Sequence, residues 1–170
     1  MSGIIGEAGS KSGIVGETGV TVGSSICQVY NSAATAVTES DSDKITFNTK
    51  VIDTRDEFDL TYNSGNGYRF VAKSGGMYWV HFSVTLQDFE DGKAMQAQIR
   101  INGATEYSGD GNYFCRVNNG RADHCTASVT SLHHIEEGTY FEGGCWHNNS
   151  SYRNTTGNSG DTFMSIVRLK

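Results

Sequence analysis

Apolar and polar residues alternate with a period of two along much of this 170-residue chain. The clearest case is GMYWVHFSVTLQD, in which every second residue from Tyr78 to Leu86 is apolar. Successive side chains of a strand point to opposite faces, so this pattern predicts a β-strand. No stretch of useful length shows the 3.6-residue period of an amphipathic helix.

Further short segments of this kind are separated by polar turn sequences such as NSGNG, EDGK, SGDGN, VNNGR and TTGNSGD. Many short strands joined by polar turns predict an all-β antiparallel sandwich or jelly roll. Besides the strand above, we expect strands in SSICQVYN, in DKITFNTKV from Asp43, in GYRFVAK from Gly67, in MQAQIRING from Met95, in HCTASVTSL from His124, in GTYFEGGCW from Gly138 and in DTFMSIVRL from Asp161.

Two of these segments carry apolar side chains on both faces. In GMYWVHF, Trp79 and His81 lie opposite the face that holds Tyr78 and Phe82. An antiparallel sheet usually leaves one face to water, so we expect a further layer over these strands. A neighbouring subunit would supply that layer, and a loop over Trp79 is the alternative. DTFMSIVRL has Phe163, Val167 and Leu169 on one face and Met164 and Ile166 on the other.

Composition narrows the class of protein. The formal net charge is -6 and the basic residues are scattered singly, which argues against a nucleic-acid surface. No apolar run approaches the roughly 20 residues needed to span a bilayer, and no secretory signal is visible. The four cysteines, at positions 27, 115, 125 and 145, lack metal-ligand spacing. We expect buried free thiols in a reducing cytosol, with a Cys115–Cys125 bridge as the alternative.

The first 24 residues differ from the rest, and we treat residues 1–24 as an arm and residues 25–170 as the folded domain. Glycines recur at intervals of three, three and four residues, so that a ten-residue pattern occurs twice in succession. The broken phase and the absence of proline exclude a collagen helix, and Lys11 has the wrong register for a phosphate loop. Such a composition cannot bury enough apolar surface to fold alone.

The domain resembles the globular head of complement C1q and its tumour-necrosis-factor-like relatives. The most specific stretch is FVAKSGGMYWVHFSV, supported by SLHHIEEGTYFEG and GDTFMSIVRL. The segment between Phe58 and Phe70 is longer than in that family, and Val80 stands where phenylalanine is preferred. The spacing that carries the resemblance runs through Phe47, Asp53, Phe58, Phe70, Gly76, Tyr78 and Phe82.

This resemblance implies a ten-stranded antiparallel jelly roll that assembles as a homotrimer around its inner sheet. The residues implied in the trimer interface are Trp79, His81, Met164 and Ile166. Those implied in the core are Phe47, Phe58, Phe70, Tyr78, Val80, Phe82 and Phe163.

The arm resembles the N-termini of virion-associated proteins of marine bacteriophages. Gly-rich backbone with paired apolar residues can order on docking into a groove or against a sheet edge, and three arms on one trimer would raise the effective concentration. A flexible leader without a partner is the alternative. The expected anchoring residues are Gly3, Ile4, Ile5, Gly6, Gly13, Ile14, Val15 and Gly16.

No catalytic motif stands out, and we expect neither an enzyme nor a cofactor. His133 and His134 are adjacent, so on a strand they point to opposite faces and cannot share a metal ion without distortion. The acidic stretch DTRDEFD from Asp53 is expected to be a solvated loop rather than an acid–base pair. The same carboxylates or Asp110 are poor candidates for calcium, which needs six to eight oxygen ligands.

Aromatic and arginine side chains in Gly/Asn-rich segments are candidates for surface recognition, because binding hot spots favour these residue types. The candidates are Tyr113, Arg116, Arg121, Trp146 and Tyr152, with Tyr107, His147 and Arg153 beside them.

These observations predict a non-enzymatic trimeric knob, fixed by its arm to the capsid or tail of a bacteriophage particle. It would be made in the host cytoplasm and would touch host-surface carbohydrate through its outer loops. The alternative is a secreted, extracellular C1q-like lectin, whose discriminating feature is glycosylation at the sequons of Asn148, Asn149 and Asn154. An enzyme on a sandwich scaffold is a third hypothesis.

Overall fold

The computed structural model of the protein describes residues 25–39, 43–61, 67–103, 112–118 and 123–169; for 112–118 it describes the backbone only. No helix in these segments is long and apolar enough to cross a membrane. The strands are β1 (Ile26–Tyr30), β2 (Ala36–Val37), β3 (Asp43–Lys44), β4 (Thr49–Asp53), β5 (Phe58–Asp59), β6 (Arg69–Val71), β7 (Gly76–Phe89), β8 (Ala94–Ile101), β9 (Asn112–Asn118), β10 (Asp123–Ile135), β11 (Tyr140–His147), β12 (Arg153–Asn154) and β13 (Phe163–Leu169).

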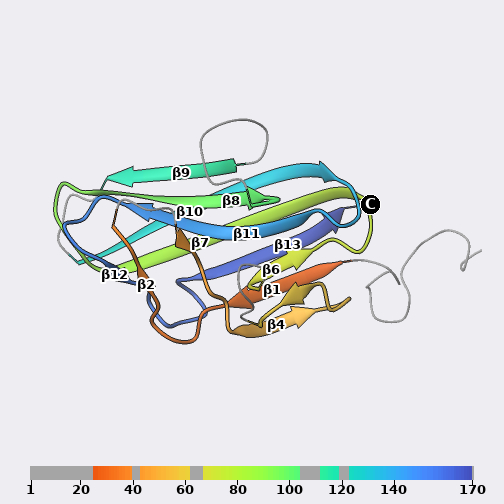
Figure 1. The fold of residues 1–170 in the computed structure, drawn as a ribbon, viewed down its shortest axis with the longest axis horizontal. Helices are drawn as coiled ribbons and strands as arrows, with labels where there is room; N and C mark the ends of the chain where they lie inside the picture. The colour runs from red at the N-terminus through yellow and green to blue at the C-terminus, as the bar shows by residue number, and fades with distance from the viewer. Residues whose placement is uncertain (1–24, 40–42, 62–66, 104–111, 119–122, 170) are drawn as a thin grey trace, which may run out of the picture.

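Two antiparallel sheets pack face to face (Figure 1). One has the strand order β10-β7-β13-β1-β4, and the other has the order β5-β6-β11-β8-β9 with β3 beside β11. Without β3, the two strand orders contain five strands each and form the expected ten-stranded sandwich. β2 and β12 pair as a small separate ribbon. The expected all-β jelly roll is confirmed.

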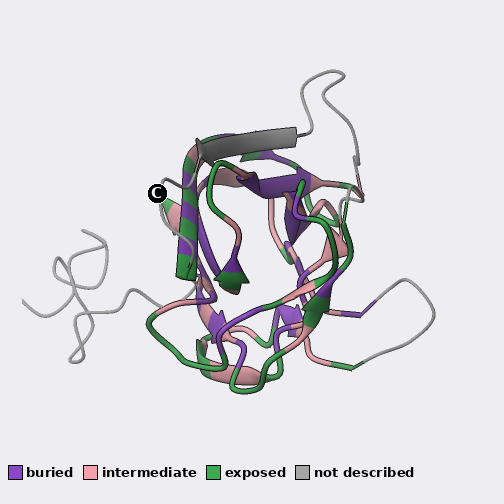
Figure 2. Cartoon of the chain, turned by 90° about the vertical axis from the view of Figure 1, so that its left-hand side faces the viewer, coloured by how far each residue is buried: buried purple, intermediate pink, exposed green. Residues whose placement is uncertain are grey.

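The core lies between the two sheets, where the buried segments face one another (Figure 2). The even-numbered residues of β7 from Tyr78 to Leu86 are fully buried, as the alternation of the sequence requires. Phe47 contacts Phe58 and Phe82 edge to face, with ring centroids 5.8 and 6.0 Å apart. All six core residues expected from Phe47 to Phe82 lie in this cluster: Phe47, Phe58, Phe70, Tyr78, Val80 and Phe82.

The face of β13 that points into the core is the opposite of the one expected. Met164 pairs with Phe82 and Ile166 with Val80, and both side chains are fully buried in the chain's own core. Phe163 instead pairs with Ser83 and lies half-buried on the other face. The assignment of Met164 and Ile166 to a trimer interface and of Phe163 to the core was therefore wrong. Both faces of this strand are apolar, so alternation alone does not fix which one points inward.

Two segments fold differently from their sequence prediction. DKITFNTKV does not form one strand: β3 belongs to one sheet and β4 to the other, and the buried Ile45 and Phe47 lie between them. NYFCRVN, expected as loop, forms β9 and pairs with β8. Turn residues surround this segment and hide its period-two pattern.

Three of the cysteines, Cys27, Cys125 and Cys145, are buried free thiols, as expected. Because Cys125 is a free thiol, the alternative Cys115–Cys125 bridge is not formed; the side chain of Cys115 itself lies outside the described part of the chain.

Candidate functional site

The outer face of the five-stranded sheet, which points away from the core, carries an apolar row close to the residue where the arm joins. Four side chains lie in register on adjacent strands β10, β7, β13 and β1: Leu132 opposite Trp79, Trp79 opposite Val167, and Val167 opposite Ile26. Leu132 is 55% exposed and the other three are half-buried. We call these four residues the apolar row.

An aromatic stack continues the apolar row along the strands. The His81 ring lies 5.9 Å from the Trp79 ring at an interplanar angle of 12°, and 5.3 Å from the Phe163 ring. Its Nδ1 lies 2.7 Å from Thr130 Oγ1. Burial lowers the pKa of His81, so this imidazole is neutral at pH 7 and adds no charge to the surface.

Further from the arm junction the same face becomes polar. Ser128 donates to Ser83 across the strands at 2.9 Å, and the hydroxyls of Thr85 and Thr126 lie 2.8 Å apart. The outer face is thus divided along its length into an apolar end and a hydroxyl-lined end.

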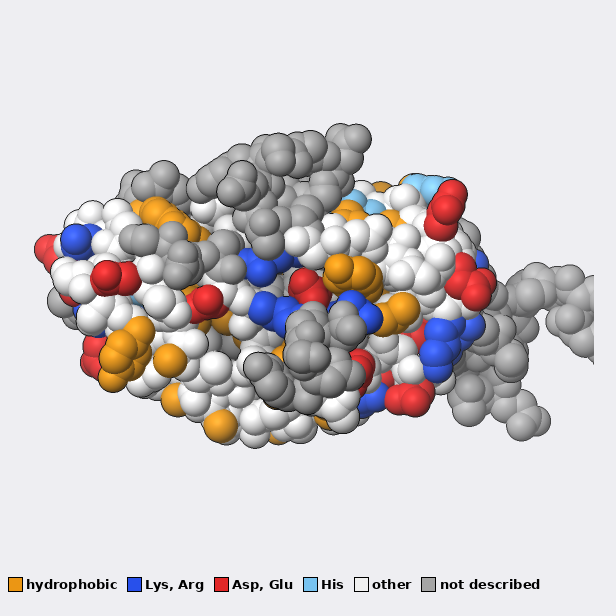
Figure 3. Space-filling view, viewed as in Figure 1, with side chains coloured by type: hydrophobic (Ala, Val, Ile, Leu, Met, Phe, Trp, Pro, Cys, Tyr) orange, Lys and Arg blue, Asp and Glu red, His pale blue; other side chains and the backbone are white. Residues whose placement is uncertain are grey.

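Exposed apolar side chains also gather on this sheet. Among the described residues, Val51, Ile52, Leu132, Leu169 and Tyr152 are the exposed large hydrophobics, and only Tyr152 lies outside the five-stranded sheet. The face seen in Figure 3 intersperses lysine and arginine with aspartate and glutamate, with separate apolar patches between them. Clustered apolar exposure on one face is the usual mark of a protein-binding surface.

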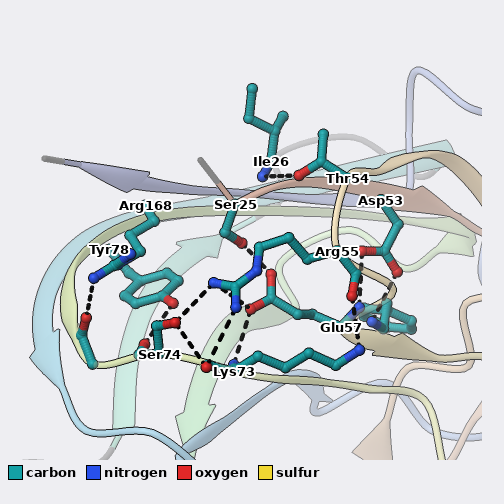
Figure 4. Close-up of polar contacts among 12 residues, drawn as sticks. Ser25, Ile26, Asp53, Thr54, Arg55, Glu57, Lys73, Ser74, Tyr78 and Arg168 are labelled. Atoms are coloured by element: carbon teal, nitrogen blue, oxygen red, sulfur yellow. Dashed lines mark hydrogen bonds and ion pairs between the residues drawn. The ribbon is translucent and has the colours of Figure 1, made fainter. Parts of the chain in front are cut away.

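A polar network ties the start of the domain to its core (Figure 4). Ser25 is fully buried, its hydroxyl donates to Glu57, and its carbonyl accepts from the Arg168 N–H at 2.9 Å. The Glu57 carboxylate also accepts from the Lys73 N–H at 2.9 Å and lies 3.7 Å from the Arg55 guanidinium. The residue that follows the arm is therefore held rigidly.

The acidic stretch is not the solvated loop that the sequence predicts. Asp53 accepts from the N–H groups of Glu57 and Phe58, each at 2.9 Å, and pairs with Lys50 at 2.9 Å. Burial disfavours its charge, but these contacts outweigh burial and hold the pKa of Asp53 below its ordinary value. Both buried carboxylates thus serve the fold. Asp56 is the member of the stretch that is solvated.

A cavity of about 460 Å³ lies beside this network. Its lining includes the apolar residues Phe58, Leu60 and Val71 and the charged residues Lys50, Asp56, Glu57, Asp59 and Lys73. Lys50 is already paired with two aspartates, and Lys73 Nζ donates to the Arg55 carbonyl at 2.7 Å. His133 and His134 point to opposite faces, one buried and one exposed, as expected. Nowhere in the described segments do three or more His, Cys, Asp or Glu side chains gather as a metal site would require.

The recognition candidates do not form one site. Tyr152 is 62% exposed, Trp146 is half-buried on β11, and Arg153 is engaged with Glu90. His147 is buried, with its Nε2 3.0 Å from the Val37 carbonyl oxygen. Tyr113 and Arg116 lie on β9, where side chains are not described. Tyr107, Arg121 and the eight expected anchoring residues lie outside the described residues.

No protein-family model matches the sequence, and no curated protein matches it. Solved structures do match the fold, and each covers 86% of this chain. Murine APRIL has a TM-score of 0.63 at 12% identity with 99% of its chain covered. The globular domain of zebrafish complement 1qA has 0.60 at 11% with 98% covered, and the Eiger TNF of S. frugiperda has 0.58 at 10% with 93% covered. The chain has the C1q/TNF-like jelly-roll fold.

Proposed function

We propose that this chain is a non-enzymatic binding module that self-associates as a trimer through the outer face of its five-stranded sheet. The observation that carries the proposal is the apolar row with the Trp79–His81–Phe163 stack, on a face where the described residues leave these side chains only half-buried. The C1q/TNF-like fold supports a recognition role.

We further propose that the arm, residues 1–24, fixes the trimer to a bacteriophage particle at the capsid or tail, after synthesis in the host cytoplasm. The resemblance of the arm to phage virion proteins supports this, and so does the rigid Ser25 junction, which would transmit an attachment at the arm to the whole domain. Three arms on one trimer would bind cooperatively through their effective concentration.

The test is deletion of residues 1–24, followed by imaging of native particles assembled with the truncated or the full chain. Full-length protein should appear as knobs on the particle and truncated protein should be absent. Sedimentation of the truncated protein is the control, because an unchanged mass assigns the lost docking to the arm alone. Truncated protein that docks at full occupancy would remove the anchoring role.

The proposal includes a contact with host-surface carbohydrate through exposed loop residues, of which Tyr152 is the best placed because its ring is free to stack on a sugar. Replacing Tyr152 with alanine should weaken retention on a host-glycan array while leaving the trimer intact. Unchanged retention would exclude this residue.

A secreted recognition protein is the second candidate, because two of its three sequon asparagines, Asn148 and Asn154, are exposed in the structure. Asn149 is buried and donates its N–H to the His147 ring. Intact-mass measurement of the protein from its native source decides between the two. An unmodified mass is expected for a phage protein, and glycans at Asn148 or Asn154 would favour secretion.

A further inference from the structure

His81 lies on the outer face of the five-stranded sheet, in register with Thr130 on β10 and Ser165 on β13. Its imidazole stacks on the Trp79 ring at 5.9 Å and lies 5.3 Å from the Phe163 ring. Its Nδ1 lies 2.7 Å from Thr130 Oγ1, and a hydroxyl can donate to a neutral imidazole or accept from a protonated one. These contacts hold the ring in place in either protonation state.

The described residues around His81 on this face carry no fixed charge. The residues in register with it, from β10 to β4, are Thr130, Ser165, Gln28 and Ile52. The neighbouring register on one side holds Leu132, Trp79, Val167 and Ile26, and that on the other side holds Ser128, Ser83, Phe163, Tyr30 and Thr49. None of them is Asp, Glu, Lys or Arg, although such residues make up 19% of the chain. His81 is therefore the group that brings a charge to this part of the face between about pH 5 and 8, the range in which histidine titrates.

The other titratable groups of this face lie further away. His134 is exposed in register with Met77 near the start of β7, and His124 lies toward the other end of β10 beside Asp123. The phenol of Tyr30 lies on β1, with β13 between it and β7.

Two further strands contact β7 without facing His81. β8 lies across the core, with its Arg100 on the face that points away from the core. β12 lies at the Leu86 end of β7, and its Arg153 pairs with Glu90. No carboxylate of the described strands is thus placed to compensate a positive charge on His81.

Protonation of His81 is easier in the separate chain than in an associated one. In the separate chain the ring is half-buried, so water and the neighbouring aromatic faces solvate an imidazolium. Burial already lowers the pKa of His81, and a second copy over the face removes the remaining water. Because the proposed trimer brings the same uncharged rows of each copy together, the neighbour adds no carboxylate from these rows. Association therefore favours the neutral ring, and by linkage it weakens as the pH falls.

We propose that His81 makes the outer face acid-sensitive: copies of the chain associate while its imidazole is neutral and separate when it is protonated. The inference rests on the proposed self-association and adds its regulation. A trimer holds three such rings, so its dissociation takes up as many as three protons and depends steeply on pH. A fixed charge at this position would prevent association at every pH, whereas a histidine prevents it only in acid.

Sedimentation equilibrium of the full chain at about pH 7.5 and about pH 5 tests the acid sensitivity. The wild-type chain should need a concentration at least about tenfold higher for half-association at the lower pH. His81→Gln stays neutral at both pH values and keeps a polar group for Thr130, so its association should not change between them. His134→Gln is the matched control on the same face and should respond as the wild type does.

A wild-type trimer of equal strength at both pH values, or a pH response that persists in His81→Gln, would overturn the acid sensitivity and leave the self-association standing. Wild-type protein that sediments as one chain at both pH values would remove both. Circular dichroism should show an intact fold at the lower pH. Unfolding there would assign the dissociation to the fold and would also overturn the proposal.

Tryptophan fluorescence measures the protonation of His81 directly, below the concentration range of association. Trp146→Phe leaves Trp79 as the single tryptophan of the chain, and a protonated imidazole quenches an indole stacked on it. Emission should fall as the pH is lowered, with a midpoint below the ordinary histidine value because burial lowers the pKa of His81. Constant emission, or the same transition after His81→Gln is added, would overturn the proposal even where the trimer is intact.

Discussion

The two faces of the five-stranded sheet use the same strands and meet different surroundings. On the inner face Val80, Phe82 and Ile166 are fully buried against the six-stranded sheet of the same chain. On the outer face Trp79 and Phe163 are only half-buried, although they are just as apolar. Large apolar side chains are usually buried. On the inner face the second sheet of the chain buries them, whereas on the outer face the described part of the chain leaves them half-exposed.

The six-stranded sheet strengthens this contrast. The face of β8 and β11 that points away from the core carries Gln96, Gln98, Arg100 and Glu142, and Glu142 pairs with Lys44 at 2.7 Å. These four side chains are buried, at 1–6% exposure, so on this face it is polar groups that the chain covers, whereas Trp79 and Phe163 on the outer face of the other sheet are apolar and only half-buried.

The largest effect is expected from a charge in the apolar row. Trp79→Glu should raise the concentration for half-association about 100-fold, because association would bury an unpaired carboxylate at a cost of roughly 3 kcal/mol. Trp146→Glu is the matched control, since Trp146 is equally half-buried on the other sheet. Sedimentation equilibrium measures both. An equal loss of association in the two variants would contradict the assignment of the interface to the five-stranded sheet.

Truncations on β13 separate its two faces. In the Trp79→Glu background, which removes the contribution of association, Ile166→Ala should lower the free energy of unfolding by about 2–5 kcal/mol through a core cavity. Phe163→Ala should lower it by only about 0.5–1.5 kcal/mol, the value of an aromatic contact. Urea titration gives both numbers. A larger loss for Phe163→Ala than for Ile166→Ala would mean that Phe163 lies in the core, as the sequence predicted.

Acid should weaken the network that flanks the inner face. The folded-state pKa of Asp53 lies below its unfolded value near 4, so its contribution to stability is complete above that pH and is lost as the pH falls through the folded-state value. Asp53→Asn should cost about 1–3 kcal/mol at pH 7 and progressively less toward pH 3. Urea titrations across this range measure the difference, and a constant difference would assign the loss to packing instead.

The smallest effect is expected in the labelling of the thiols that face the core. Burial raises the pKa of Cys27 and of Cys145 far above the ordinary thiol value, so neither forms the reactive thiolate at pH 8. In the Cys115→Ser variant a thiol reagent should label these two positions only after unfolding, as peptide mapping would show. Rapid labelling of the native protein would mean that the inner face opens to solvent.

Much of the fold could be predicted from the sequence, because alternation is a local property. The strand from Tyr78 to Leu86 and the turns between strands follow from period and residue type. The phase of Met164 and Phe163 could not be predicted, since both alternate sets are apolar and only pairing with β7 decides between them.

The candidate site could be predicted from the sequence only in part, because some of its features depend on how the strands pair. Trp79 and His81 stand out because they interrupt an otherwise polar set, whereas the exposure of Val51 depends on a bulge created by pairing with β1. Burial of Glu57 depends on Ser25, a partner distant in sequence that only the folded chain brings near. The spacing of Asp53 from the N–H groups of Glu57 and Phe58 is the one local signal that could have identified a turn there.

Sedimentation equilibrium of the full wild-type chain at micromolar concentration directly measures the proposed self-association through the outer face. Because the outer face carries the apolar row and the described residues do not cover it, we expect a mass of three chains, stable on dilution until the concentration falls below the dissociation range. A well-behaved species of one chain mass across the whole range would contradict it.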